Sequence, residues 1–253
     1  MKKPLILICN DDGVTAPGIQ SLIEAVRDLG DIMVVAPDKP QSGTGHGITI
    51  NATLRMQKLR EEEGLTVYSC SGTPVDCIKL AIYKMEVKPD VIISGINHGS
   101  NASINVIYSG TMSAAMEASI NDIPALGFSL LDFSQDADFE PSKRYIGELI
   151  RYTLDNGLDN TKLLNVNIPK LPADKIKGIR ICRQAEAQWV ENFKEGLDPS
   201  QQPYFWLTGV FVNRDQGHDT DVWALSEGYV SVVPCAHDLT AYKAIGELKG
   251  LEN

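Results

Sequence analysis

Short apolar runs alternate with helix-like segments through the first half of the chain. Residues 5–9 are continuously apolar, which is typical of a parallel strand buried on both faces. Residues 19–29 carry apolar side chains at helical spacing, and residues 32–36 form a second apolar run. This order predicts a β-α-β unit, a motif that requires a parallel pair of strands.

The same alternation continues along the chain. Further strands are predicted over 65–71, 91–93, 124–130 and 163–168, and helices over 75–85, 111–121 and 141–154. Repeated β-α order predicts an α/β fold, in which a Rossmann-like, mostly parallel sheet has helices on both faces.

The second half of the chain is less regular. Between residues 179 and 233 the helix signal fades, and turn-like segments separate extended ones. We predict a β-hairpin arm near 185–220, a late strand over 228–233 and a closing helix over 241–249. The boundary is placed at 130, so that 1–130 form a Rossmann-like catalytic core and 131–253 complete the fold.

Composition excludes several classes of protein. Of 253 residues 43% are hydrophobic, which excludes a disordered chain, and the net charge of −10 argues against binding of bulk nucleic acid. No apolar run approaches the roughly 18 residues of a membrane span. The five cysteines lack CxxC spacing, which argues against a zinc site or a disulfide framework. We therefore expect a cytoplasmic protein with reduced cysteines and no membrane partner.

Two adjacent carboxylates follow the first strand, in the segment Asn10-Asp11-Asp12-Gly13. Open α/β sheets bind ligands at the carboxyl ends of their strands. Because neighbouring carboxylates repel each other, they need protons or a cation, and a hard divalent ion is the simplest partner. The alternative is a polar turn, since Asp and Gly are common in turns.

Polar side chains also follow two other predicted strands. Ser42 lies in a Gly-rich loop that lacks the P-loop pattern, and its hydroxyl can offer a neutral oxygen to a metal. Asn97 can supply a carbonyl oxygen to a cation, and Asn101 can donate amide hydrogens to an anion. Taken alone, each segment is equally consistent with a flexible polar loop.

A fourth segment, Ser109-Gly110-Thr111, begins the predicted helix over 111–121. Free backbone N–H groups and the helix dipole make such an N-terminus suitable for phosphate, although a plain N-cap is the alternative. Because all four segments follow strands, we expect them at one edge of the sheet. Two aspartates, a hydroxyl and an amide carbonyl would form an all-oxygen site for Mg²⁺ or Mn²⁺ beside a phosphate site.

Five sequence blocks in order resemble the SurE (survival protein E) nucleotidases. They are NDDG at 10–13, VAPDKPQSGTG at 35–45, GTPVDC at 72–77, SGINHGSN at 94–101 and YSGTMSAAME at 108–117. The agreement covers roughly residues 5–130, with a weaker match at Thr220-Asp221. Five ordered blocks are far more specific than one short motif.

The resemblance implies a metal-dependent 5′-nucleotidase that hydrolyses nucleoside 5′-monophosphates, and in some members 3′-monophosphates and short polyphosphate. Matching the family's motifs implies one Mg²⁺ or Mn²⁺ per subunit, held by Asp11, Asp12, Ser42 and Asn97. It likewise implies phosphate contacts at Asn10, Asn101, Ser109, Gly110 and Thr111, with Asp11, Asp12 and Asn101 as catalytic residues. Family members use a β-hairpin arm to form dimers or tetramers, so a homodimer or homotetramer is implied.

Several alternatives remain open. A non-catalytic nucleotide- or metal-binding module would keep the same pocket without turnover. A haloacid-dehalogenase-type phosphatase needs an aspartate nucleophile where this chain has Asn10, and a dinucleotide oxidoreductase needs a GxGxxG that is absent after the first strand. A further alternative is that one of the two aspartates acts as a base or a nucleophile instead of a metal ligand.

Other polar and aromatic residues receive simpler interpretations. His46 and His98 are acid/base candidates, but the motifs around them do not require histidine, and we interpret both as loop histidines. Asp76 and Cys77 precede a helix and are interpreted as structural. The three tryptophans, Trp189, Trp206 and Trp223, indicate core or subunit contacts.

Overall fold

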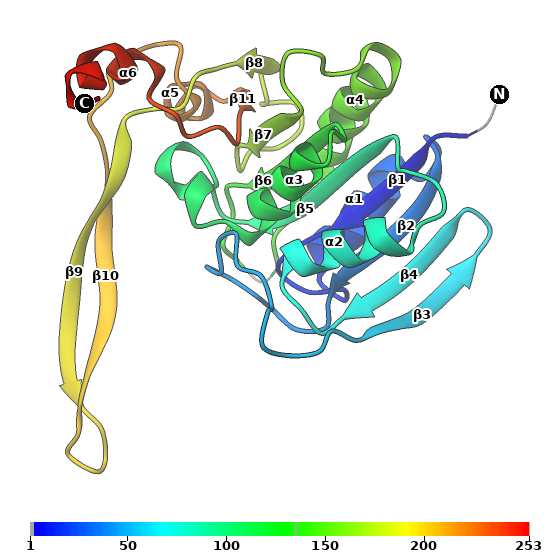
Figure 1. Cartoon of the computed structure of the whole chain (residues 1–253), viewed down its shortest axis with the longest axis horizontal. Helices are drawn as coiled ribbons and strands as arrows, with labels where there is room; N and C mark the ends of the chain where they lie inside the picture. The colour runs from blue at the N-terminus through cyan, green and yellow to red at the C-terminus, as the bar shows by residue number, and fades with distance from the viewer. Residues whose placement is uncertain (1–2, 135, 253) are drawn as a thin grey trace.

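The computed structural model describes residues 3–134 and 136–252, which form one large sheet, a two-stranded arm and the surrounding helices. The strands of the large sheet are β1 (Leu5–Cys9), β2 (Asp31–Pro37), β3 (Met56–Glu62), β4 (Leu65–Cys70), β5 (Val91–His98), β6 (Ala125–Leu130), β7 (Leu163–Ile168), β8 (Ile179–Ile181) and β11 (Val230–Cys235). Their order is β3-β4-β2-β1-β5-β6-β7-β11-β8, and the strands from β4 to β7 run parallel (Figure 1). The mostly parallel sheet is therefore confirmed.

Helices cover both faces of this sheet. On one face α1 (Pro17–Val26) packs beside α4 (Glu140–Asn156), and on the other α2 (Pro74–Lys84) packs beside α3 (Gly110–Ile120). Alternate residues of β1 serve the two sides, because side chains along a strand point to opposite faces. Ile6 and Ile8 join the core under α1 and α4, whereas Leu7 and Cys9 join the core under α2 and α3.

The strand order reverses direction at β1. From β1 the chain moves through α1 to β2 on one side, and it later returns through α2 to β5 on the other side. Helices at such a switch point diverge, so the carboxyl ends of β1 and β5 border a crevice in which α/β proteins bind ligands. Two of the predicted polar segments, the one that follows β1 and the one that begins within β5, lie at this point.

The predicted arm is a long antiparallel hairpin formed by β9 (Ala187–Leu197) and β10 (Pro203–Asn213). It projects away from the body of the molecule (Figure 1). The short helix α5 (Asp221–Ser226) follows it, and α6 (Tyr242–Leu248) lies near the base of the arm. Two 3₁₀ helices, η1 (Ser103–Ile107) and η2 (Lys249–Leu251), complete the elements, and within the described ranges no helix has the length and apolar character of a membrane span.

Several features were not predicted from the sequence, among them β3, α5, β8 and the C-terminal part of β5. The edge strand β3 is polar and exposed, so it lacks the apolar run that marks a buried strand. Helix α5 is too short for helical periodicity, although Thr220 caps it by accepting from Trp223 N. Strand β5 extends to His98, beyond the apolar run at its start. The large sheet includes strands from both sides of residue 130, and the domain boundary at that position stays a prediction.

Asp76 fixes the long loop that follows β2. Its carboxylate accepts hydrogen bonds from Thr49 N (3.0 Å), Thr49 Oγ1 (2.6 Å) and Thr73 N (2.9 Å). Thr73 in turn caps α2, so the two residues form a capping box. Burial alone would raise the pKa of Asp76, but the hydrogen bonds from Thr49 and Thr73 outweigh it and hold the pKa below its ordinary value. The structural interpretation of Asp76 follows from these contacts.

Asp76→Ala should lower the free energy of unfolding by about 2 kcal/mol, because it removes a helix cap and leaves the donors of Thr49 unpaired. Chemical denaturation at pH 7 measures this change, with the exposed Asp174→Ala as the matched control. Since the folded-state pKa of Asp76 is lowered, its stabilisation is present at neutral pH and is lost as the pH falls through that pKa. The difference in the free energy of unfolding between wild type and Asp76→Asn should therefore become smaller in acid. A difference that does not change with pH would contradict the stabilising role of the Asp76 carboxylate.

Candidate active site

A cavity of about 290 Å³ opens at the carboxyl ends of the central strands. Its walls bring together residues from all four predicted segments: Asp11, Asp12, Ser42, Asn97, Asn101 and Ser109. The remaining predicted residues, Asn10, Gly110 and Thr111, are buried directly behind this wall. The predicted convergence on one sheet edge is what the structure shows, and the role of each residue stays a prediction.

Asp11 is the most confined of the polar groups. Its side chain is buried, and Thr111 Oγ1 donates a 2.5 Å hydrogen bond to its Oδ1. Burial raises the pKa of Asp11 to about 6, and the neighbouring charge of Asp12 adds to this, whereas the hydrogen bond from Thr111 opposes it. A carboxylate held in this way gains from a nearby cation, which would stabilise its charged form.

Gly110 allows helix α3 to begin against Asp11. A Cβ at Gly110 would lie 2.7 Å from the Cβ of Asp11, which is closer than side-chain atoms approach each other. Ser109 is the N-cap of this helix, and its Oγ accepts from Met112 N at 3.0 Å. The start of α3, with its free N–H groups, is thus placed beside the two carboxylates.

Asn10 shapes the turn that carries these carboxylates. Its side chain donates to Gly13 O (2.9 Å) and accepts from Gly13 N (3.2 Å), and it has no exposed surface. Gly13 has φ of +102°, a conformation that favours glycine. The side chain of Asn10 therefore orders the loop from behind, and the structure does not bring it onto the cavity wall.

Asn97 lines the cavity, and its side-chain amide is held by two hydrogen bonds. Its amide nitrogen donates to the backbone oxygens of His98 (3.0 Å) and Gly99 (2.9 Å). Because both partners are acceptors, the orientation of the amide group is determined, and Oδ1 is the atom left for a cation. The loop that carries Ser42 is joined to the same site, since Gln41 N donates to Asp11 O at 2.7 Å.

The two histidines of the motifs have different surroundings. His98 lines the cavity, its Nδ1 lies 3.3 Å from Asp12 Oδ2, and its ring packs edge-on against Phe139. His46 instead contacts Glu117 Oε2 on α3 at 3.0 Å. His98 thus orients Asp12, a contact between segments distant in sequence that the motif alone does not reveal.

A buried network of side-chain amides supports the cavity floor. Asn101 donates through Nδ2 to Ser129 Oγ (2.8 Å) and through its backbone N–H to Asn167 Oδ1 (2.8 Å). Asn165 donates to Asn101 O (2.8 Å), and Asn167 donates to Asn165 Oδ1 (2.9 Å). Sequence analysis missed this support. The available signal was two asparagines in the otherwise apolar strand LLNVNI, where polar side chains need partners.

Asp221 joins the site to the base of the arm. Its fully buried carboxylate accepts from Ser103 N (2.7 Å), Ala185 N (3.0 Å) and Val222 N (2.8 Å). Ser103 also donates through its hydroxyl to the backbone oxygens of Ala185 and Ala187. The match to Thr220-Asp221 thus marks a structural junction between η1, α5 and the arm.

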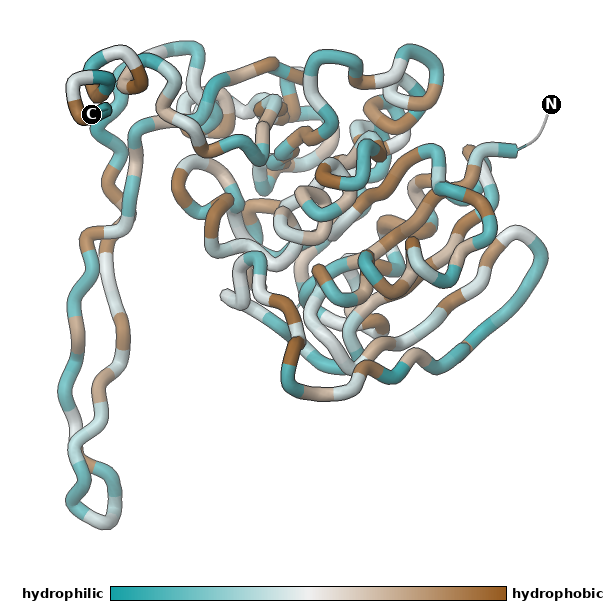
Figure 2. Tube along the Cα trace, viewed as in Figure 1, coloured by the Kyte–Doolittle hydropathy of each residue, from teal (hydrophilic) through white to brown (hydrophobic). Residues whose placement is uncertain are grey.

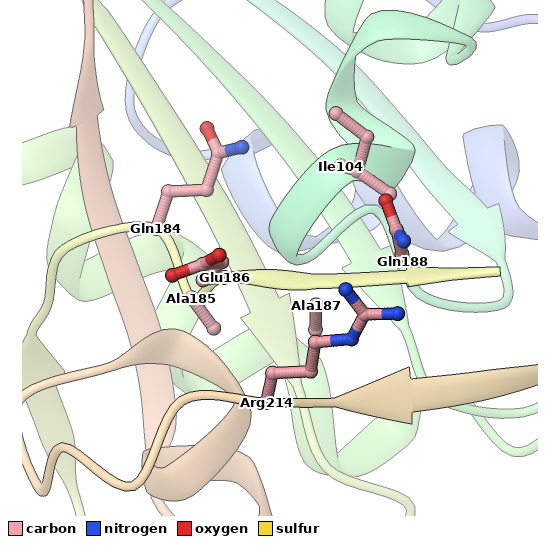
Figure 3. A pocket seen from close by; sticks show the side chains of 7 residues that line it. All are labelled: Ile104, Gln184, Ala185, Glu186, Ala187, Gln188 and Arg214. Carbon is pink, nitrogen blue, oxygen red and sulfur yellow. The ribbon is translucent and has the colours of Figure 1, made fainter.

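A separate cavity of about 210 Å³ lies at the base of the arm (Figure 3). It is lined by Ile104 of η1, by residues just before β9 and at its start, and by the residue that follows β10: Gln184, Ala185, Glu186, Ala187, Gln188 and Arg214. None of these is a predicted site residue. The chemistry predicted from the motifs therefore belongs to the cavity at the sheet edge.

The donor set at the sheet edge fits a hard divalent cation. Among the described residues no cluster of three or more His, Cys, Asp or Glu side chains is arranged for a metal ion. An ion at this site would depend on the two carboxylates, the neutral oxygens of Ser42 and Asn97, and water. Such a mixed oxygen set suits Mg²⁺ or Mn²⁺, because Mg²⁺ keeps several water ligands in protein sites.

Binding of Mn²⁺ should weaken as the pH falls through about 6, because a proton then competes for Asp11. Thr111→Val removes the hydrogen bond that lowers the pKa of Asp11, so the loss of affinity should begin at higher pH. Titration calorimetry at several pH values measures both effects. Ser113→Ala is the matched control, because its hydroxyl bonds Ser109 O on the same helix and not Asp11. Identical pH profiles for Thr111→Val and wild type would contradict this role of Thr111.

Comparison with known proteins gives one consistent result. The family model described as "Survival protein SurE" matches residues 6–191. The chain is 58% identical over 250 residues to "5'-nucleotidase SurE" of Christiangramia forsetii, an alignment that covers 98% of this chain and 96% of that protein. It is 57% identical to the protein of the same name in Flavobacterium psychrophilum, with 98% and 97% covered.

A solved structure shares the fold as well. The crystal structure of the SurE protein from Aquifex aeolicus matches with a TM-score of 0.85 and 38% sequence identity, covering 99% of this chain and all of that one. The match extends over the arm and the C-terminal part, beyond the blocks on which the sequence resemblance depends. By its family model, its near full-length relatives and its fold, this chain belongs to the SurE family.

Proposed function

We propose that this protein is a metal-dependent 5′-nucleotidase that hydrolyses nucleoside 5′-monophosphates to nucleoside and phosphate. The observation that carries the proposal is the meeting of two carboxylates with a helix N-terminus in one cavity. The relatives at 57–58% identity bear the name of this activity. Action on 3′-monophosphates and short polyphosphate is part of the proposal, since both present the same terminal phosphate.

The proposed metal ligands are Asp11, Asp12, Ser42 and Asn97, with one Mg²⁺ or Mn²⁺ per subunit. Two observations support this. The amide nitrogen of Asn97 already donates two hydrogen bonds, which leaves its oxygen for a cation, and burial raises the pKa of Asp11, so a cation would stabilise its charged form. A bound divalent ion supplies Lewis acidity toward a phosphoryl oxygen and lowers the pKa of coordinated water. The contact between His98 and Asp12 orients the Asp12 carboxylate, and so determines which of its oxygens faces the proposed metal ion.

Phosphate is proposed to bind at the start of α3. The N–H groups of Gly110 and Thr111 lie at a helix N-terminus, which favours an anion. The Ser109 hydroxyl accepts from Met112 N, so its own hydrogen remains available to a phosphate oxygen. Asn101 uses one amide hydrogen on Ser129 and keeps the other. These donors stabilise charge on the phosphoryl oxygens during transfer.

Phosphate release from nucleoside 5′-monophosphates, measured with Mg²⁺ or Mn²⁺, tests the proposal. Asp11→Asn should lower kcat/KM by about 100-fold or more, because a metal ligand worth several kcal/mol is lost. EDTA should abolish release, and added metal should restore it. The control Asp174→Asn, in an exposed segment away from the cavity, should match wild type. Tight metal and nucleotide binding without any release would instead identify a non-catalytic binding module.

We also propose that the arm mediates formation of a homodimer or homotetramer. Apolar side chains are exposed on both faces of this two-stranded ribbon: on one face Phe193, Phe205 and Leu207, and on the other Trp206 and Val210. Figure 2 shows hydrophobic residues interspersed with hydrophilic ones along both strands of the hairpin. A lone two-stranded ribbon is marginally stable in water, so contact with a second copy accounts for its length and composition.

The double variant Phe193→Ser, Leu207→Ser removes a directly paired apolar couple from one face of the arm. It should lower the molar mass measured by light scattering to that of a smaller assembly. Glu191→Ser on the same strand is the control and should leave the mass unchanged. A wild-type mass equal to one chain of 27.7 kDa would contradict the proposal.

A cytoplasmic location completes the proposal. All five cysteines are free thiols, and four of them are buried. This state suits a reducing compartment, where protein thiols persist without forming disulfides.

A further inference from the structure

An apolar hollow adjoins the candidate active site on the side of the arm. This hollow has a volume of about 430 Å³ and is lined mainly by Leu131, Phe133, Trp189, Phe211, Val222 and Leu225. The side chains come from the segment after β6, the base of the arm and helix α5. No step of the phosphate chemistry described above uses any of them.

The hollow and the cavity at the sheet edge share part of their walls. Ser100, Asn105, Phe133 and Trp189 line both. A phosphoester whose phosphate lies at the start of α3 therefore has this hollow as the neighbouring space for the rest of the molecule. The volume lies within the ordinary range for small-molecule pockets, about 300–1,000 Å³.

Trp189 is held in place although it is about half exposed. Its indole N–H donates a 2.9 Å hydrogen bond to Asn105 Oδ1, and its ring packs edge-on against Phe211 at 5.6 Å. Asn105 is itself anchored, because its amide donates to Ser100 O at 3.3 Å. A ring that is already fixed loses little conformational entropy when a flat ligand stacks on it.

Phe133 supplies a second exposed ring. It is 79% exposed and lies directly over Gly99, where a Cβ would be 2.1 Å from Phe133 Cε1. Gly99 also has a φ of +91°, which favours glycine. The absence of a side chain at Gly99 thus leaves room for this ring at the border of the hollow and the active site.

We propose that this hollow binds the nucleobase of the substrate, with Trp189 and Phe133 as stacking surfaces. The inference rests on the proposed nucleotidase activity and assigns the leaving nucleoside its binding site. Flat aromatic bases stack on such rings largely without regard to base identity. Because the walls are mainly apolar, base recognition depends on stacking area, so purine nucleotides should be preferred over pyrimidine nucleotides and all four should be accepted.

Kinetic measurements on one substrate that carries a nucleobase and on one that lacks it test the assignment. Adenosine 5′-monophosphate and ribose 5-phosphate present the same phosphoester, but only the first carries a base. Trp189→Ala should raise KM for adenosine 5′-monophosphate about tenfold through loss of stacking, and Phe133→Ala should act in the same direction. Neither variant should change kcat/KM for ribose 5-phosphate. Trp189→Phe, which keeps an aromatic ring, should recover most of the loss.

Tyr83→Ala is the control, because Tyr83 is an exposed aromatic residue on α2, about as exposed as Phe133, and lies outside both cavities. It should leave both substrates unaffected. An equal loss on both substrates in Trp189→Ala, or a change in molar mass that accounts for the loss, would overturn the assignment and point to a contact between copies. Unchanged kinetics on both substrates in Trp189→Ala and Phe133→Ala would overturn it as well.

Nucleoside binding without turnover separates this inference from the proposed activity. In a Trp206→Phe, Trp223→Phe background, Trp189 is the remaining tryptophan of the chain. Adenosine should quench its fluorescence saturably, and ribose should not. Quenching without phosphate release would support the hollow while contradicting the nucleotidase. Phosphate release without quenching by adenosine would contradict the hollow alone.

Discussion

The burial of Asp11 beside a second carboxylate is the constraint on which the rest of the site depends. Burial limits the solvation of this group, and its charged form is stabilised by the hydrogen bond from Thr111 and would be stabilised further by the proposed divalent cation. That requirement explains why α3 begins with Gly110, since any side chain there would meet Asp11. The same approach places free N–H groups where a phosphate can bind. The proposed cation site and the proposed phosphate site therefore both depend on the contact between Gly110 and Asp11.

The rest of the fold serves to keep that contact in place. The reversal of strand order at β1 separates the helices that flank the crevice, so the space beside Asp11 is not filled by backbone. The amides of Asn101, Asn165 and Asn167 then build a polar floor from strand β7, far along the chain. Each of these amide nitrogens donates to at least one acceptor, so the network orders the floor without leaving a buried amide nitrogen unpaired. The C-terminal half thus contributes to the site without presenting a catalytic motif.

The sequence predicts those features that depend on local patterns, and it does not predict contacts between segments far apart in the chain. Hydrophobic periodicity is local, so the alternation of strands and helices, and hence the sheet edge that gathers Asp12, Ser42 and Asn97, can be predicted. Contacts such as His98 with Asp12, or Asp221 with Ser103, depend on how distant segments meet, which no local pattern contains. The strand β3 and helix α5 escaped prediction because one is polar and the other has six residues.

The outer part of the arm and its base have different surroundings. Its outer part exposes apolar side chains on both faces, which the proposed contact with a second copy would cover, whereas its base is bound to the body through Ser103, Asp221 and Trp189. Because Trp189 is anchored by Asn105, next to the active site, movement of the arm base would move a wall of the cavity. The proposed assembly through the arm would therefore also fix the aromatic surface beside the proposed phosphate site. A tryptophan on this strand can thus belong to a subunit contact and to the wall of the cavity, since the same strand forms both.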